Sequence, residues 1–199
     1  MADSRDGRDK QARDEENRQR MRAMLEELER GDETEPEVPE ADLDDLAADL
    51  EAVSYPATPE AVVDAVGDRR LRAGERTFRV AELIPEDDEV SFDDAKTVRA
   101  RVERPTIAAA MKRVVEAART AEGDGFGTSQ RKAYERTFRE LQAIDAVDDD
   151  AGIDVIADWI VERIAETGAT PGSRDVRRRA AKFCRSQGYT VGNDEWLGV

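Results

Sequence analysis

The chain has 199 residues, of which 47 are acidic and 31 are basic, and its formal net charge is −16. It contains no histidine, which excludes histidine-based triads, relays and metal sites, and its single cysteine excludes an internal disulfide. No segment approaches the roughly 18 apolar residues of a membrane-spanning helix, and the N-terminus lacks the apolar segment of a signal peptide. We therefore expect a cytoplasmic protein without membrane contact.

The acidity is typical of proteins that work in concentrated salt. The basic residues comprise 26 arginines and only 5 lysines. At about 1 M salt the Debye length is roughly 3 Å, so a large net charge repels itself little and serves mainly hydration. We expect most carboxylates to form a solvated coat; the alternative is that they mimic nucleic acid or hold a metal ion.

Residues 1–40 are almost wholly polar, and we predict that they form a largely disordered arm. Within this arm, apolar residues at helical spacing predict a helix within residues 15–30. A helix of three to four turns needs a partner surface to be stable. Its apolar residues Met21, Leu25 and Leu28 are therefore candidates for protein interaction.

Residues 41–122 are predicted to form a helical subdomain with one small β-hairpin near residues 70–81. Apolar and polar residues alternate on either side of a turn that contains glycine, which places Phe78 and Val80 on one strand face. Leucines at helical spacing predict a helix over residues 41–53.

Capping residues predict where the other helices of this subdomain begin. Thr58 suits the N-cap of the helix before the hairpin, with Pro59 in its first position and Gly67 at its end. Ser91 suits the N-cap of the helix after the hairpin. Pro105 separates that helix from the next one.

Residues 123–199 are predicted to form an all-helical C-terminal subdomain that ends in a basic helix and a short tail. Apolar residues at helical spacing predict helices at 131–144 and 153–166. In the second of these, Trp159 is placed on the apolar face with the isoleucines. The predicted fold class is mainly α with one small β-hairpin, in bundle-like helical subdomains that follow an N-terminal polar arm.

The basic helix is predicted from an N-cap at Ser173 to a stop at Gly188, and it holds six basic residues and one acid. At about 100° per residue, its apolar residues gather on one side. These are Val176, Ala180, Phe183 and Cys184. On nearly the opposite side lie Arg174, Arg178, Lys182 and Arg185, with Arg177 and Arg179 on the flanks.

Two interpretations of this helix compete. In the first, its cations contact phosphates, because the planar fork of arginine binds phosphate oxygens bidentately. The candidate nucleic-acid-binding residues are then Arg174, Arg177, Arg178, Lys182 and Arg185. In the second, the cations pair with acids of the same chain, such as Asp148–Asp150 or the arm.

The C-terminal tail contains Trp196 and Leu197, whose exposure to water would be costly. Either this pair folds back over the last helices or it anchors another protein. Together with the helix of the arm it supports an alternative function, that of a protein–protein adaptor or homo-oligomeric scaffold.

No catalytic residue, metal ligand or cofactor site is predicted. The segment GDGFG follows a helix rather than a strand, unlike a phosphate-binding loop. The segment DDDAGID lacks the closing glutamate of a calcium loop. Cys184 lies on an apolar helix face, which favours a buried thiol over a nucleophile. We expect a non-enzymatic binding protein; an uncharacterised enzyme is the third alternative, after the adaptor or scaffold.

Several segments together resemble an uncharacterised family of acidic haloarchaeal proteins. They are GRDKQARDEENRQR, YPAT followed by VVDAVGD, ERPTIAAAMKRV, and the closing PGSRDVRRRAAKFCRSQGYTVGNDEWLGV. This resemblance implies a habitat of high salt and a cytoplasmic location, and it carries no activity. The basic helix is also similar to small helical modules of subunit-binding and nucleoid-associated proteins with an R-x-W/F-A-x-x-x-G run, although Phe183 and the tail depart from that pattern.

Overall fold

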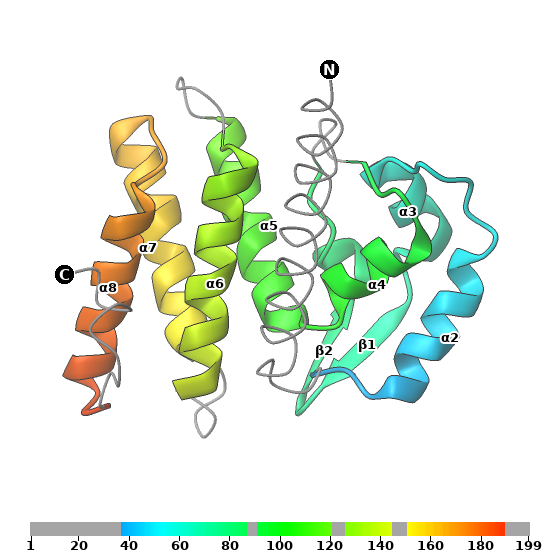
Figure 1. Cartoon of the computed structure of the whole chain (residues 1–199), viewed down its shortest axis with the longest axis horizontal. Coiled ribbons are helices and arrows are strands. Elements are labelled where there is room, and N and C mark those ends of the chain that lie inside the picture. Colours follow the sequence, from blue (N-terminus) through cyan, green and yellow to red (C-terminus); the bar gives the residue numbers. More distant parts are fainter. Residues whose placement is uncertain (1–36, 87–90, 121–125, 145–150, 190–199) are drawn as a thin grey trace, which may run out of the picture. The chain divides into compact units, whose positions relative to one another are not determined.

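A computed structural model describes residues 37–86, 91–120, 126–144 and 151–189, all of which belong to one compact unit, residues 36–199. Within these ranges the fold is mainly α with one two-stranded antiparallel hairpin, which confirms the predicted fold class (Figure 1). The predicted arm helix with Met21, Leu25 and Leu28, the acids 148–150, and the tail residues Trp196 and Leu197 lie outside the described residues.

The described elements fall into two groups along the chain. The first contains α2 (Glu40–Leu50), α3 (Pro59–Val66), β1 (Arg70–Ala73), β2 (Arg76–Arg79), the one-turn 3-10 helix η1 (Val80–Glu82) and α4 (Ala95–Val102). The second contains α5 (Pro105–Arg119), α6 (Thr128–Ile144), α7 (Ala151–Thr167) and α8 (Ser173–Ser186).

Local signals of the first group act largely as the sequence predicts. The Thr58 hydroxyl accepts a hydrogen bond from the Ala61 N–H at 3.2 Å, Pro59 occupies the first turn of α3, and Gly67 is its C-cap. The hairpin pairs Leu71 with Phe78, and both side chains are buried. The predicted caps of α3 and the predicted hairpin are confirmed.

Three boundaries of the first group differ from the prediction. The helix α2 ends at Leu50, although the leucine pattern predicts a helix as far as residue 53. The N-cap of α4 is Asp94 rather than Ser91, and its carboxylate accepts the Thr97 N–H at 2.7 Å. The reason is tertiary, because Phe92 exchanges two backbone hydrogen bonds with Ala57 and is held extended. Val80 is buried as predicted, but it begins η1 instead of continuing the strand.

Two apolar clusters form the core, and α5 contributes to both. The first cluster comprises side chains from Val38 to Val102 together with Ala108. The second comprises Ile107 and side chains from Ala110 to Cys184. Figure 1 shows α5 beside the α6–α8 bundle on one side and the hairpin with α4 on the other, in agreement with the contacts of α5 with β1 and α4. The subdomain limits proposed at residues 41–122 and 123–199 stay predictions.

Arginines hold the acidic helix α2 in place. Arg99 of α4 donates to the carboxylates of Glu40 and Asp44, the latter at 3.0 Å. Arg69, before β1, pairs with Asp49 and, at 3.4 Å, with Asp45. Hydrogen bonds to Glu40 first and Asp44 second raise the pKa of Arg99 above its ordinary value. Arg69 and Arg99 thus use their charges within the fold.

None of the helices in the described ranges is both long and apolar enough to cross a lipid bilayer.

Candidate nucleic-acid interface

The helix α8 buries one side and exposes the other, as predicted. Val176, Ala180 and Cys184 are at most 1% exposed, and α8 packs against α6 and α7. Arg174, Arg178, Lys182 and Arg185 are exposed. We call these four residues the basic face. Since every buried side chain of the helix is small or apolar, packing alone orients the basic face toward water.

The start of α8 is fixed by α6. The Pro171 carbonyl, just before the helix, accepts hydrogen bonds from the Tyr134 hydroxyl and, at 2.8 Å, from the Gln130 side-chain amide. The N-cap is Gly172 rather than the predicted Ser173, because the Gly172 carbonyl already accepts the first helical N–H groups. The cap therefore contributes no side-chain hydrogen bond, and anchoring by α6 replaces it.

Tyr134, which anchors that turn, is completely buried. Burial raises the pKa of its hydroxyl to about 12. The hydroxyl therefore stays protonated throughout the physiological range and remains a hydrogen-bond donor to Pro171.

The end of α8 is a glycine-based cap. Gly188 has φ +82°, a conformation that favours glycine. The Tyr189 N–H donates to the Cys184 carbonyl at 2.9 Å and the Gly188 N–H to the Arg185 carbonyl at 3.1 Å. These two bonds define a Schellman motif, which confirms the predicted stop at Gly188.

The five predicted nucleic-acid-binding residues are not equivalent. Arg178 lies 3.8 Å from Asp175, a long ion pair between two well-exposed side chains. No ion pair among the described residues involves Arg174, Lys182 or Arg185. Arg177 is only half-exposed, so it stands apart from the basic face. The structure thus brings four of the five predicted cations together on one exposed surface.

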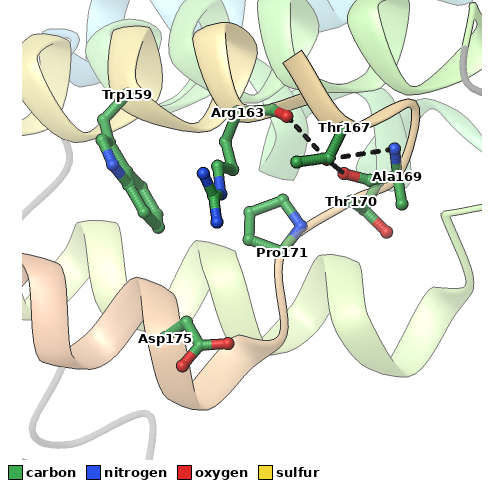
Figure 2. Close-up of a pocket in the computed structure, with 7 residues that line it drawn as sticks. All are labelled: Trp159, Arg163, Thr167, Ala169, Thr170, Pro171 and Asp175. Carbon is green, nitrogen blue, oxygen red and sulfur yellow. Dashed lines mark hydrogen bonds between the residues drawn. The ribbon is translucent and has the colours of Figure 1, made fainter. Parts of the chain in front are cut away.

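An open hollow of about 450 Å³ adjoins the start of α8. The sequence did not predict this hollow. Trp159 and Arg163 of α7, Pro171 of the connecting turn and Asp175 of α8 line it (Figure 2). Trp159 was predicted on the apolar face of its helix, yet its side chain is only half-buried. The guanidinium of Arg179 lies 5.9 Å from the centroid of its ring. Helical spacing cannot show such a hollow, because it forms only where α7 and α8 meet.

A second basic surface was also missed, on the outer side of the hairpin. Arg70 and Arg72 of β1 are exposed, and Arg70 lies directly opposite Arg79 of β2. Arg79 is engaged by Glu82, whose pKa is lowered chiefly by a hydrogen bond from the Arg79 backbone N–H. The alternation of arginines in RLRAGERTFR could have predicted this surface.

Groups of three or more acidic or thiol side chains that could hold a metal ion do not occur in the part of the chain that the structure describes.

Comparison with known proteins finds one family. Residues 38–114 match the model of a family of unknown function, DUF5789. The match covers the first group of elements and most of α5, and it ends before α6–α8. Comparisons with curated proteins and with solved structures give no match. An uncharacterised domain is therefore established for residues 38–114, while the basic face lies beyond it.

Proposed function

We propose that the protein is a non-enzymatic binding protein whose basic face contacts the phosphates of a nucleic acid. The observation that carries the proposal is the exposure of Arg174, Lys182 and Arg185, which form no ion pair among the described residues. On a chain of net charge −16, cations gathered on one rigid helix and left to solvent favour an anionic partner.

The geometry of α8 supports contact along a phosphate backbone. Arg174, Arg178 and Lys182 are spaced four residues apart, or about 6 Å along the helix axis at 1.5 Å per residue. The helix is held at its start by α6 and closed at its end by Gly188. The cations therefore project from a rigid element, which lowers the entropy lost on binding.

The test is a titration with DNA and RNA over a series of potassium chloride concentrations. It compares the wild type with Arg174→Ala/Lys182→Ala/Arg185→Ala and with the control Arg70→Ala/Arg72→Ala/Lys96→Ala. The control removes three exposed cations from other elements and gives the same net charge. We expect the first variant to make the log–log salt slope shallower by about two to three, since each phosphate contact contributes about 0.7–0.9. We expect the control to change it by less than about one.

Equal losses in the two variants would overturn the proposal, because they would show that net charge rather than the basic face determines binding. A larger loss in the control would overturn it in favour of the exposed arginines of the hairpin. No binding by the wild type, at salt low enough for contact and high enough for folding, would also overturn it. The alternative would then be the adaptor or homo-oligomeric scaffold, whose predicted anchors are Met21, Leu25, Leu28, Trp196 and Leu197.

We also propose that the protein is halophilic and works in the cytoplasm of a cell with concentrated internal salt. The chain has 47 acidic and only 31 basic residues, and lysine is scarce; both features support this habitat. Thermal unfolding in increasing potassium chloride tests it: we expect the unfolding temperature to rise into the molar range. A flat or falling dependence would contradict it.

A further inference from the structure

The hollow between α7 and α8, which we call the Trp159 hollow, has walls of two kinds. Trp159 and the ring of Pro171 supply aromatic and apolar surface, and the Arg163 side chain extends between them (Figure 2). Asp175 lies across from them on α8. A volume of about 450 Å³ is ample for one planar heterocycle and too small for a folded partner.

The aromatic wall is flanked by arginines. Arg179 places its guanidinium 5.9 Å from the centroid of Trp159, and Arg163 is half-exposed and lies 3.4 Å from the carboxylate of Glu166. Aromatic rings beside arginines are the usual platform on which unpaired bases stack, because every base offers a π-face. Such a platform does not depend on base identity.

Asp175 decides which part of a nucleic acid fits. Its carboxylate repels a phosphate, whereas it accepts hydrogen bonds from the N–H groups of a base. Asp175 is also 3.8 Å from Arg178 of the basic face, so the hollow and the basic face adjoin. Phosphates lying along α8 would therefore have their bases within reach of the hollow.

We propose that the Trp159 hollow binds an unpaired base of a single-stranded nucleic acid whose phosphates lie along the basic face. This inference rests on the proposed function and narrows it from nucleic acid in general to single strands. Bases in a duplex are stacked and paired, and to enter the hollow one would have to be flipped out at a cost in free energy. The hollow therefore discriminates against duplexes.

The chain has two tryptophans, Trp159 and Trp196. The experiment uses the full chain with Trp196→Phe, so that Trp159 is the only tryptophan that remains. Its fluorescence is followed while a mixed-sequence oligonucleotide of about 12 nucleotides is added, either single-stranded or as a blunt duplex. We expect the single strand to quench Trp159 and the duplex to leave its emission nearly unchanged.

Two further variants separate stacking from folding. In Trp159→Leu we expect the affinity for the single strand to fall about five- to hundredfold, as for the loss of one stacked base, and the affinity for the duplex to change little. Trp159→Phe keeps an aromatic ring and should restore much of the affinity. Circular dichroism of each variant shows whether the helix content of the chain is retained.

The outcomes distinguish the two proposals. If the single strand binds without changing Trp159 emission, or if Trp159→Leu weakens both forms equally, the hollow holds no base. The proposed contact of the basic face with phosphates is unaffected by that outcome. If neither form binds, the proposed function fails and this inference fails with it. Quenching confined to the single strand, together with rescue by phenylalanine, would establish the base site.

Discussion

Two arginines of the first group, Arg69 and Arg99, are used in the opposite way to those of the basic face. In the first group, Arg69 and Arg99 each contact two carboxylates of α2, and both side chains are less than a third exposed. On α8, Arg174 and Arg185 are exposed and form no ion pair among the described residues. The same residue type therefore holds the fold together in one region and faces solvent in the other.

Two acids of α7 form ion pairs with elements other than α8. Asp154 and Asp158 pair with Arg113 of α5 at 2.8 and 2.5 Å, and Asp154 also lies 3.6 Å from Arg76 of the hairpin. These carboxylates are thus engaged by α5 and the hairpin, although α7 also packs against α8. Charge count alone therefore does not show which cations are used within the fold, whereas the pairing of each cation does.

The largest effect should come from the apolar packing of the second group. Phe138 is completely buried in α6 within the second core cluster. Phe138→Ala should lower the free energy of unfolding by about 3–5 kcal/mol, measured by urea denaturation. A loss no larger than that from removing the cations of α8 would mean that apolar packing does not dominate this half.

A smaller effect is expected where arginine holds the fold. Arg69→Ala/Arg99→Ala should lower the free energy of unfolding by about 1–2 kcal/mol, because exposed ion pairs contribute about 0.2–1 kcal/mol each. The loss should shrink as potassium chloride screens the pairs. Equal losses at low and high salt would show that the arginine stems, not their charges, matter.

The anchor of α8 predicts a pH dependence. Tyr134→Phe removes the hydrogen bond to Pro171 and should cost about 1 kcal/mol at neutral pH. Because the folded-state pKa of Tyr134 is raised to about 12 from 10.0, its stabilisation is complete below pH 10 and is lost as pH rises toward 12. Wild-type stability should therefore fall more steeply than that of the variant over this window.

The measurement is urea denaturation of both proteins at several pH values. Tyr55, whose pKa is raised by burial and then by Asp94, is present in both and cancels in the difference. Parallel pH profiles for the two proteins would contradict the assignment to Tyr134.

The smallest effect on the free energy of unfolding should come from removing the cations of the basic face. Arg174→Ala/Lys182→Ala/Arg185→Ala should change the free energy of unfolding by less than about 0.5 kcal/mol, since exposed side chains without partners contribute little. Urea denaturation beside the Arg69→Ala/Arg99→Ala variant measures the contrast. If this variant lost more unfolding free energy than Arg69→Ala/Arg99→Ala, the basic face would itself stabilise the fold, contrary to our expectation.

Much of the fold follows from local patterns in the sequence. Thr58, Pro59 and Gly67 predict α3, and alternation around Gly74 predicts the hairpin, because these signals act within a few residues. The prediction for α4 was wrong at its cap, since the pairing of Phe92 with Ala57 is a contact across the chain. The division of the core within α5 likewise depends on tertiary packing.

The candidate site divides in the same way. The basic face was predicted because residues three and four apart share one side of a helix. The Trp159 hollow was not predicted, because helical spacing along α7 assigns Trp159 to the core. Spacing within one helix cannot show how much of that side chain α8 covers. The anchoring of Pro171 by Tyr134 joins residues 37 apart and leaves no local pattern.

The single cysteine is a built-in probe of how often α8 separates from the bundle. Cys184 is 1% exposed on the side of the helix that faces the bundle, opposite the basic face. A thiol reagent can reach it only when α8 leaves α6 and α7 or the whole unit opens, so the alkylation rate reports the free energy of that opening. The wild-type chain therefore carries its own label for measuring how firmly the helix is held.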